Sequence, residues 1–314
     1  MSTRIETSPA TYRHHSLTSD PGRMASWLED APRDIAGIHD LTTRLVFHYR
    51  GGGDPLEQGF TPDRLDEINL RYADEMLARL HALQSGSICL PREATHRILG
   101  CCRDFTLLFV SLARAAGIPA RSRVGFAGYF TDGWWIDHVV AEVWDAADGR
   151  WRLVDAQLPE GFPDVGTGAP LEVLDVPRDR FLVGPDAWQA ARSGAFDHDR
   201  FAVAPEIDLP FLRSWGYLAH NLVVDLAAVN KDEMLLWEIW GVLAALDADP
   251  AAVPDEATAD RFDALAAAMA APDVDAAGFA RLYTGDLVVP GTITRLSPYD
   301  DSSREVALRQ APVV

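Results

Sequence analysis

The sequence is poor in positive charge. Lysine and arginine together number 28 against 47 aspartates and glutamates, the net charge is −19, and Lys231 is the only lysine. Proteins that bind the phosphates of nucleic acids or anionic lipids usually carry a basic stripe. We therefore expect neither nucleic acid nor a membrane among the main partners, and we attribute the acidity to solubility.

Long apolar runs and paired cysteines are also lacking. No stretch approaches the roughly 20 apolar residues of a membrane span. The opening MSTRIETSPATYRHHS is polar where a signal peptide would have an apolar core. The three cysteines are an odd number, which does not suggest a secreted disulfide framework. These absences predict a cytoplasmic protein with reduced thiols.

The chain does contain enough apolar sequence for a large core. Hydrophobic residues make up 48% of its 314 residues, which suits one large domain or two modest ones. The pattern along the chain predicts three parts. A loosely ordered lead-in over residues 1–33 precedes a core over 34–160, and a mainly helical region over 161–314 packs on that core.

The first half of the core is predicted to be helical. Helical patterns cover 34–50 and 61–83, the latter with apolar residues on one face. A third helix begins at Cys102 and is apolar nearly all round, so it should be buried. Gly117 suits the left-handed position that ends such a helix.

Two strand-like segments follow, at 138–144 and 150–155, with the turn sequence DAADG between them. A helix followed by an antiparallel sheet is an α+β pattern. His138 opens the first strand and Asp155 closes the second, so a hairpin brings both to one end. A four-residue loop at 145–148 would set them opposite each other on one face. A three-residue loop would put them on opposite faces unless a bulge intervened.

Cys102 has the surroundings of a thiol nucleophile. It stands where a buried helix begins, and the positive end of a helix lowers the pKa of a thiol. His138 could act as its base and Asp155 could orient that base. We expect the neighbouring Cys101 to be packed and inert. A zinc site formed by these cysteines with His96 and His138 is the rival interpretation, but adjacent cysteines bind one ion poorly.

The segments GCCRDFTLLFVSLARAAGIPARSRVGF and DHVVAEVWDAADGRWRLVDAQ resemble the catalytic core of the transglutaminase-like superfamily. The shared pattern is Gly-x-Cys before a helix that ends in Gly-Ile-Pro-Ala-Arg, then a strand with His, then a strand that ends in Asp. The resemblance implies a papain-like cysteine-protease core in which Cys102 is the nucleophile, His138 the base and Asp155 its partner. It also implies that the backbone N–H of Cys102 binds the oxyanion, and Gln84 is a candidate second donor.

The segment HNLVVDLAAVNKDEMLLWEIWG (220–241) crowds polar side chains and tryptophans together. It is either an amphipathic helix with a tryptophan-rich buried side or the wall of a cleft over the triad. In the second case Lys231 and Trp237 would contact the substrate, together with Gln84 and Trp135 from the core.

These features predict an enzyme of thiol-dependent acyl chemistry. Cys102 would attack the carbonyl of an amide or ester in a peptide, protein or small molecule and form a thioester. Water would then make the protein a peptidase or amidase, and an amine would make it an acyltransferase or amide synthase of small-molecule metabolism. A scaffold that binds a partner without turnover is the alternative from another class. We expect no cofactor, and no calcium loop of the EF-hand type is visible.

Overall fold

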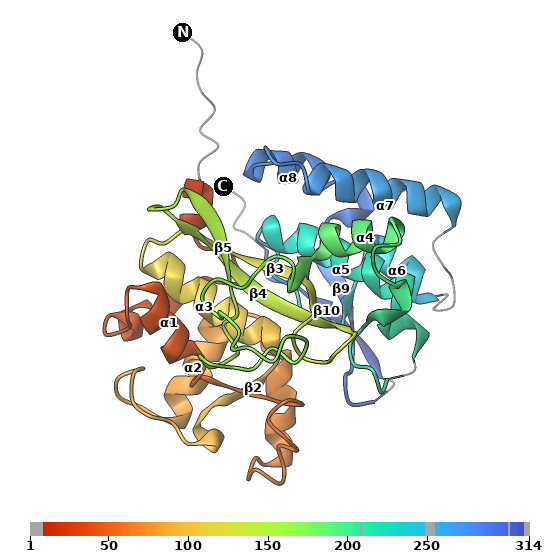
Figure 1. The fold of residues 1–314 in the computed structure, drawn as a ribbon. Coiled ribbons are helices and arrows are strands. Elements are labelled where there is room, and N and C mark those ends of the chain that lie inside the picture. Colours follow the sequence, from red (N-terminus) through yellow and green to blue (C-terminus); the bar gives the residue numbers. More distant parts are fainter. Residues whose placement is uncertain (1–8, 208, 249–254, 301, 311–314) are drawn as a thin grey trace.

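A computed structural model describes residues 9–207, 209–248, 255–300 and 302–310, and Figure 1 shows their fold. The main sheet crosses the middle of the molecule. Helices α1, α2 and α3 lie on one side of it and helices α4 to α8 on the other. This mixture of helices with a mostly antiparallel sheet confirms the predicted α+β class.

The bounds of the elements are as follows. The helices are α1 (Ile35–Thr42), α2 (Ala73–Leu83), α3 (Cys102–Ala115), α4 (Gly184–Arg192), α5 (Ser214–Val229), α6 (Gly241–Ala248), α7 (Glu256–Met269) and α8 (Ala276–Leu282). The strands are β1 (Val46–His48), β2 (Ile98–Gly100), β3 (Ala120–Ala127), β4 (Trp135–Asp145), β5 (Arg150–Val154), β6 (Phe181–Val183), β7 (Phe201–Ala202), β8 (Glu238–Ile239), β9 (Thr292–Leu296) and β10 (Ser303–Ala307).

The main sheet has the strand order β5-β4-β3-β6, and β7 pairs with β4. Strands β3, β4, β5 and β6 are antiparallel to one another, whereas β7 runs parallel to β4. Helix α5 covers part of the edge of β3, because the Asp225 carboxylate accepts a hydrogen bond from the backbone N–H of Val124 at 2.8 Å. The same carboxylate forms a bidentate ion pair with Arg123, so α5 is joined firmly to the sheet.

Helix α3 is the buried helix that the sequence predicted. Every residue from Cys102 to Arg114 is buried. The helix ends where Ile118 and Pro119 follow Gly117, whose φ of +78° confirms the predicted left-handed position. Because α3 is buried all round, it packs against α1, α2 and the sheet at once.

Two predicted helices are shorter than the pattern suggested. The stretch 61–83 divides into a 3-10 helix (Pro62–Asn69) and α2, with Leu70 in an extended conformation between them. Arg64 explains the break, because its guanidinium donates to the carbonyls of Thr95 and Arg97 and holds the 3-10 turn against the segment before β2. Such tertiary contacts override helical periodicity.

The stretch 34–50 likewise contains α1 and then a strand, β1. Val46, Phe47 and His48 pair in parallel with β2. β-Branched and aromatic residues favour an extended chain where a partner strand is present. This pairing sets His48 directly beside Gly100, two residues before Cys102.

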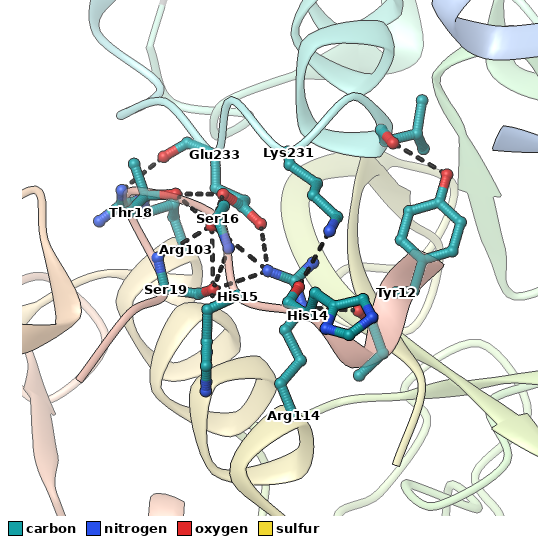
Figure 2. A network of polar contacts seen from close by, with 12 residues as sticks. Tyr12, His14, His15, Ser16, Thr18, Ser19, Arg103, Arg114, Lys231 and Glu233 are labelled. Atoms are coloured by element: carbon teal, nitrogen blue, oxygen red, sulfur yellow. Dashed lines mark hydrogen bonds and ion pairs between the residues drawn. The ribbon is translucent and has the colours of Figure 1, made fainter. Parts of the chain in front are cut away.

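The predicted loosely ordered lead-in is wrong for residues 9–33, and residues 1–8 lie outside the described part of the chain. Figure 2 shows the reason. Glu233 is buried and accepts hydrogen bonds from Ser16 and Thr18, and it pairs with Arg114 of α3 at 3.0 Å. The N-terminal segment therefore fills a polar gap between α3 and the turn after α5, where its hydroxyls satisfy buried charges.

The boundary predicted at residue 160 runs through one continuous core. Strands β6 and β7 join the main sheet from beyond it, and one buried cluster contains Cys102 and Val124 together with Tyr217 and Leu222 of α5. The parts of the chain before and after residue 160 therefore cannot be separated without exposing the apolar side chains of this shared cluster to water. In the described part of the chain, no helix combines the length and the apolar character needed to cross a bilayer.

Candidate active site

Cys102 is the first residue of α3, and the chain before it is sterically confined. Cys101 occupies the N-cap position, and its backbone N–H donates to the Asp104 carboxylate at 2.8 Å. A Cβ on Gly100 would lie 2.6 Å from an Asp104 oxygen and 2.9 Å from a Val46 methyl carbon. Glycine is therefore needed at position 100 to bring Cys102 to the positive end of the helix.

His138 and Asp155 come together through the register of the hairpin. Ala141 pairs with Val154, and a four-residue loop joins Asp145 to Arg150. This register places Asp155 opposite Val140, on the same face as His138 and two residues along the strand. The loop has the predicted length but begins one residue later than expected, so the two residues are diagonal neighbours. His138 Nε2 lies 2.8 Å from Asp155 Oδ2.

Asp155 is held in its charged form. Its Oδ2 also accepts a hydrogen bond from the Tyr129 hydroxyl at 2.6 Å, and its Oδ1 accepts from the backbone N–H groups of Gln157 and Leu158. Burial opposes ionisation, but the charge of His138 and these hydrogen bonds outweigh it and hold the pKa of Asp155 below its ordinary value.

His138 is correspondingly held as an imidazolium. Burial alone would lower its pKa, but the Asp155 carboxylate and Cys102 outweigh burial and raise the pKa from 6.5 to about 10. Because Nε2 is bonded to Asp155, Nδ1 is the nitrogen left for Cys102, which is also a hydrogen-bond partner of His138. The arrangement is a linked chain of thiol, imidazole and carboxylate.

Cys102 has a depressed pKa, and its neighbour contributes to that shift. A hydrogen bond from the Cys101 thiol is the largest cause, burial opposes it, and His138 adds a further hydrogen bond and a positive charge. The same hydrogen bond raises the pKa of Cys101 well above its ordinary value. Cys101 is buried as expected, and its raised pKa keeps its thiol un-ionised, while its S–H group favours the neighbouring thiolate.

His48 is a member of the site that the sequence did not reveal. Its Nδ1 accepts hydrogen bonds from the backbone N–H groups of Gly51 at 2.9 Å and Arg50 at 3.2 Å, so the ring proton resides on Nε2. Burial lowers the pKa of His48 and keeps the ring neutral, and the charges of Cys102 and His138 also act on it. The Nε2–H group of His48 is therefore a candidate second N–H donor, beside the backbone of Cys102. The long-range pairing of β1 with β2 gave no signal in the sequence.

Asp137 was also missed. Its carboxylate accepts hydrogen bonds from the Tyr217 hydroxyl and the Asn221 amide, both at 2.8 Å. It projects from the opposite face of β4 to His138, because successive residues of a strand alternate. Helix α5 therefore supplies both hydrogen-bond partners of this carboxylate.

The structure places the four predicted substrate-binding residues differently. Trp135 is buried in the cluster that contains Cys102, stacked on Phe201. Trp237 lies edge-on to Tyr49. The pKa of Tyr49 is raised mainly by burial and further by the charges of Cys101 and Cys102, so Tyr49 and Trp237 are near the site.

Gln84 and Lys231 make structural contacts instead. The Gln84 side-chain amide donates to the Pro91 carbonyl in the turn after α2. Lys231 Nζ donates to the His14 carbonyl at 3.0 Å, which ties the N-terminal segment to the turn after α5, as Figure 2 shows. Lys231 therefore acts as a tether between these two segments.

Among the described residues, one group of side chains could converge on a metal ion. It consists of Asp197, His198 and Asp199, lies largely exposed, and does not include the cysteines. Asp197 already accepts a hydrogen bond from the backbone N–H of Asp199, and His198 bonds to Ser214. Exposed acidic groups of this kind are common on acidic proteins, and this one is not part of the site at Cys102.

A comparison with known protein families agrees with this geometry. A family model described as the transglutaminase-like superfamily matches residues 63–156, which include Cys102, His138 and Asp155. None of the curated proteins matches the chain. One solved structure, named a putative cysteine protease from Cytophaga hutchinsonii, matches with a TM-score of 0.31 and 17% identity; the match covers 55% of this chain and 44% of that one. Residues 63–156 of this chain thus match the transglutaminase-like superfamily.

Proposed function

We propose that this protein is an enzyme that carries an acyl group on Cys102 as a thioester. One observation supports this proposal above the others. The thiol at the start of α3, the His138 imidazole and the Asp155 carboxylate form one buried group, in which His138 is hydrogen-bonded to Asp155 and its positive charge lowers the pKa of Cys102. In that arrangement the thiolate is the nucleophile, and the imidazolium is stabilised by the carboxylate.

The reaction follows from the positions of the protons. The Cys102 thiolate attacks a carbonyl carbon, and the negative oxygen that forms is bound by the backbone N–H of Cys102 and by Nε2–H of His48. His138 then gives its Nδ1 proton to the leaving amine or alcohol, which departs as the thioester forms. Water or an amine, deprotonated by the same nitrogen, attacks the thioester and restores the thiolate.

The choice between water and an amine decides between an amidase or peptidase and an acyltransferase or amide synthase. Substrates in either case are amides or esters of peptide, protein or small-molecule origin. A transglutaminase-like domain is compatible with both reactions, so an experiment must identify whether water or an amine accepts the acyl group.

The test has two parts. Iodoacetamide at about pH 6 should modify Cys102 faster than Cys89, because only a thiol with a depressed pKa is ionised there. Intact-mass analysis with a panel of amides and esters should then show an acyl adduct on the wild type and none on Cys102→Ala. Equal, slow modification of Cys89 and Cys102 would contradict the proposal. Addition of hydroxylamine or a primary amine to the trapped adduct distinguishes transfer from hydrolysis.

A further inference from the structure

Asp155 lies just beyond the paired part of its hairpin. The last pair between β4 and β5 joins Ala141 to Val154, so Asp155 itself stands outside this ladder. Its backbone N–H donates instead to the Val173 carbonyl at 2.8 Å. The direction in which the Asp155 carboxylate points therefore depends on contacts from outside the hairpin.

A tight turn over residues 155–158 fixes one oxygen of that carboxylate. Oδ1 accepts hydrogen bonds from the backbone N–H groups of Gln157 at 3.0 Å and Leu158 at 3.3 Å. The other oxygen, Oδ2, then faces His138, 2.8 Å from Nε2. Because both oxygens belong to one planar group, a change in the shape of the turn would move Oδ2 relative to the imidazole. The geometry of the triad is therefore linked to the geometry of this turn.

His39 of α1 closes the turn from outside. Its Nε2 lies 3.0 Å from the carbonyl oxygen of Asp155 and 3.0 Å from that of Leu158, the first and last residues of the turn. Carbonyl oxygens only accept hydrogen bonds, so Nε2 carries the ring proton and donates to both. His39 is 2% exposed, so water competes little for these bonds. One N–H group thus holds both ends of the turn.

Helix α1 is itself packed against this turn. Ile38 and Leu41 of α1 belong to the same buried cluster as Val154 and Ala156, which lie on either side of Asp155. Closely packed side chains leave little room for one element to slide past another. The apolar contacts therefore keep α1 beside the turn, and His39 adds the hydrogen bonds that give the turn its orientation.

We propose that His39 is a positioning residue of the triad, which holds the 155–158 turn so that the Asp155 carboxylate faces His138. The inference rests on the proposed function, because it concerns the same triad, and it assigns to α1 a part in the reaction that acts through Asp155. Without this donor the turn can relax, the contact between Asp155 and His138 weakens, and the Cys102 thiolate loses part of its stabilisation.

The test is the pH profile of iodoacetamide modification at Cys102 in three variants of His39. His39→Gln keeps an N–H donor that can reach as far as Nε2. His39→Asn carries the same amide on a side chain one methylene shorter, and His39→Leu has no donor. In the asparagine and leucine variants the ionisation constant of Cys102 should fall about tenfold, as expected for the loss of one buried hydrogen bond, so the midpoint moves to higher pH. His39→Gln should keep the wild-type midpoint.

Thr42→Val is the matched control. Thr42 is buried on the same helix, and its hydroxyl donates to the Ile38 carbonyl at 2.8 Å. This substitution removes a buried donor to a backbone carbonyl and leaves the 155–158 turn with its contacts. It should lower the free energy of unfolding in urea titrations and keep the wild-type midpoint. A merely structural role of His39 would give the same pattern in the His39 variants.

The outcomes separate the inference from the proposed function. An unchanged midpoint in folded His39→Leu, an equal shift in Thr42→Val, or equal shifts in His39→Gln and His39→Asn would overturn the inference and leave the proposed function standing. If His39→Leu and His39→Asn do not fold, ¹⁵N spectra of the histidines decide, with His39 assigned by the signal lost in His39→Gln. A protonated Nε2 that exchanges slowly with water supports the inference, and an unprotonated Nε2 overturns it. If wild-type Cys102 is modified no faster than Cys89, the proposed function fails and the inference fails with it.

Discussion

Replacing Asp155 by asparagine should separate the electrostatic role of this residue from its packing. Asparagine has nearly the same shape, and its oxygen can still accept hydrogen bonds from Gln157 and Leu158. The charge that faces His138 Nε2 at 2.8 Å is lost. Because that charge is the main reason why the pKa of His138 is raised from 6.5 to about 10, the imidazolium should lose most of its stabilisation.

The size of the effect follows from the burial of the pair. His138 is 2% exposed and Asp155 is fully buried, so solvent screens their interaction weakly. Removing one partner of a buried pair costs about 3–5 kcal/mol, which corresponds to about 10²- to 10⁴-fold in a rate that depends on it. We therefore expect Asp155→Asn to lower kcat/KM for any substrate of Cys102 by about 10²- to 10⁴-fold.

The assay is the rate of iodoacetamide modification of Cys102 as a function of pH. In the wild type the rate should rise at a pH well below 9, the ordinary thiol value, because the pKa of Cys102 is depressed. In Asp155→Asn the midpoint should move upward, since the imidazolium that favours the thiolate is lost. The control is Asp164→Asn, which also removes a buried carboxylate, here paired with Arg180. An unchanged midpoint in Asp155→Asn, or an equal shift in Asp164→Asn, would refute the reasoning.

Four further predictions concern the site and its support. Replacing His48 by alanine should lower kcat by about 10²- to 10³-fold through the loss of an oxyanion donor, while the alkylation rate of Cys102 stays within about threefold. Cys101→Ala should raise the pKa of Cys102 in the alkylation profile, whereas Cys101→Ser, which keeps a donor, should not. The rate of acylation should rise with pH as Cys102 ionises and fall again near pH 10, where His138 loses its proton. The ion pair of His138 with Asp155 should contribute fully to the free energy of unfolding below pH 6.5. That contribution should be lost as the pH rises through about 10, and urea titrations can follow the loss. Glu233→Gln should lower the free energy of unfolding by about 3–5 kcal/mol in the same titrations, because a buried arginine loses its partner.

Matched variants give these predictions their controls. His96→Ala removes an exposed histidine, and Glu93→Gln removes an exposed carboxylate; both should be close to neutral. A kcat of His48→Ala equal to that of His96→Ala would remove His48 from the oxyanion site. Equal unfolding free energies for Glu233→Gln and Glu93→Gln would show that the buried network contributes nothing to stability.

The sequence by itself determined the elements whose signals are local. The helix that starts at Cys102 could be read from its apolar residues and from the Gly-Ile-Pro that ends it, because helical periodicity and caps involve neighbours in the chain. The same locality made the hairpin visible, although β4 begins at Trp135 and not at His138, and β5 ends at Val154, just before Asp155. Cys102, His138 and Asp155 all lie in these segments. The family pattern spans these same segments.

Only the tertiary structure decided the rest, because it depends on residues far apart in the chain. A shift of the hairpin loop by one residue moves Asp155 from opposite His138 to a diagonal position, and loop composition does not specify that shift. His48 joins the site through the pairing of β1 with β2, and Asp137 gains its partners from α5, 80 residues or more away. Ser16 donates a hydrogen bond to Glu233, 217 residues away in the chain. Contacts of this kind hold the N-terminal segment, for which the sequence predicted loose order, against the core. Contacts of such range are set by how the packed elements bury their polar groups, and a linear pattern does not contain that information.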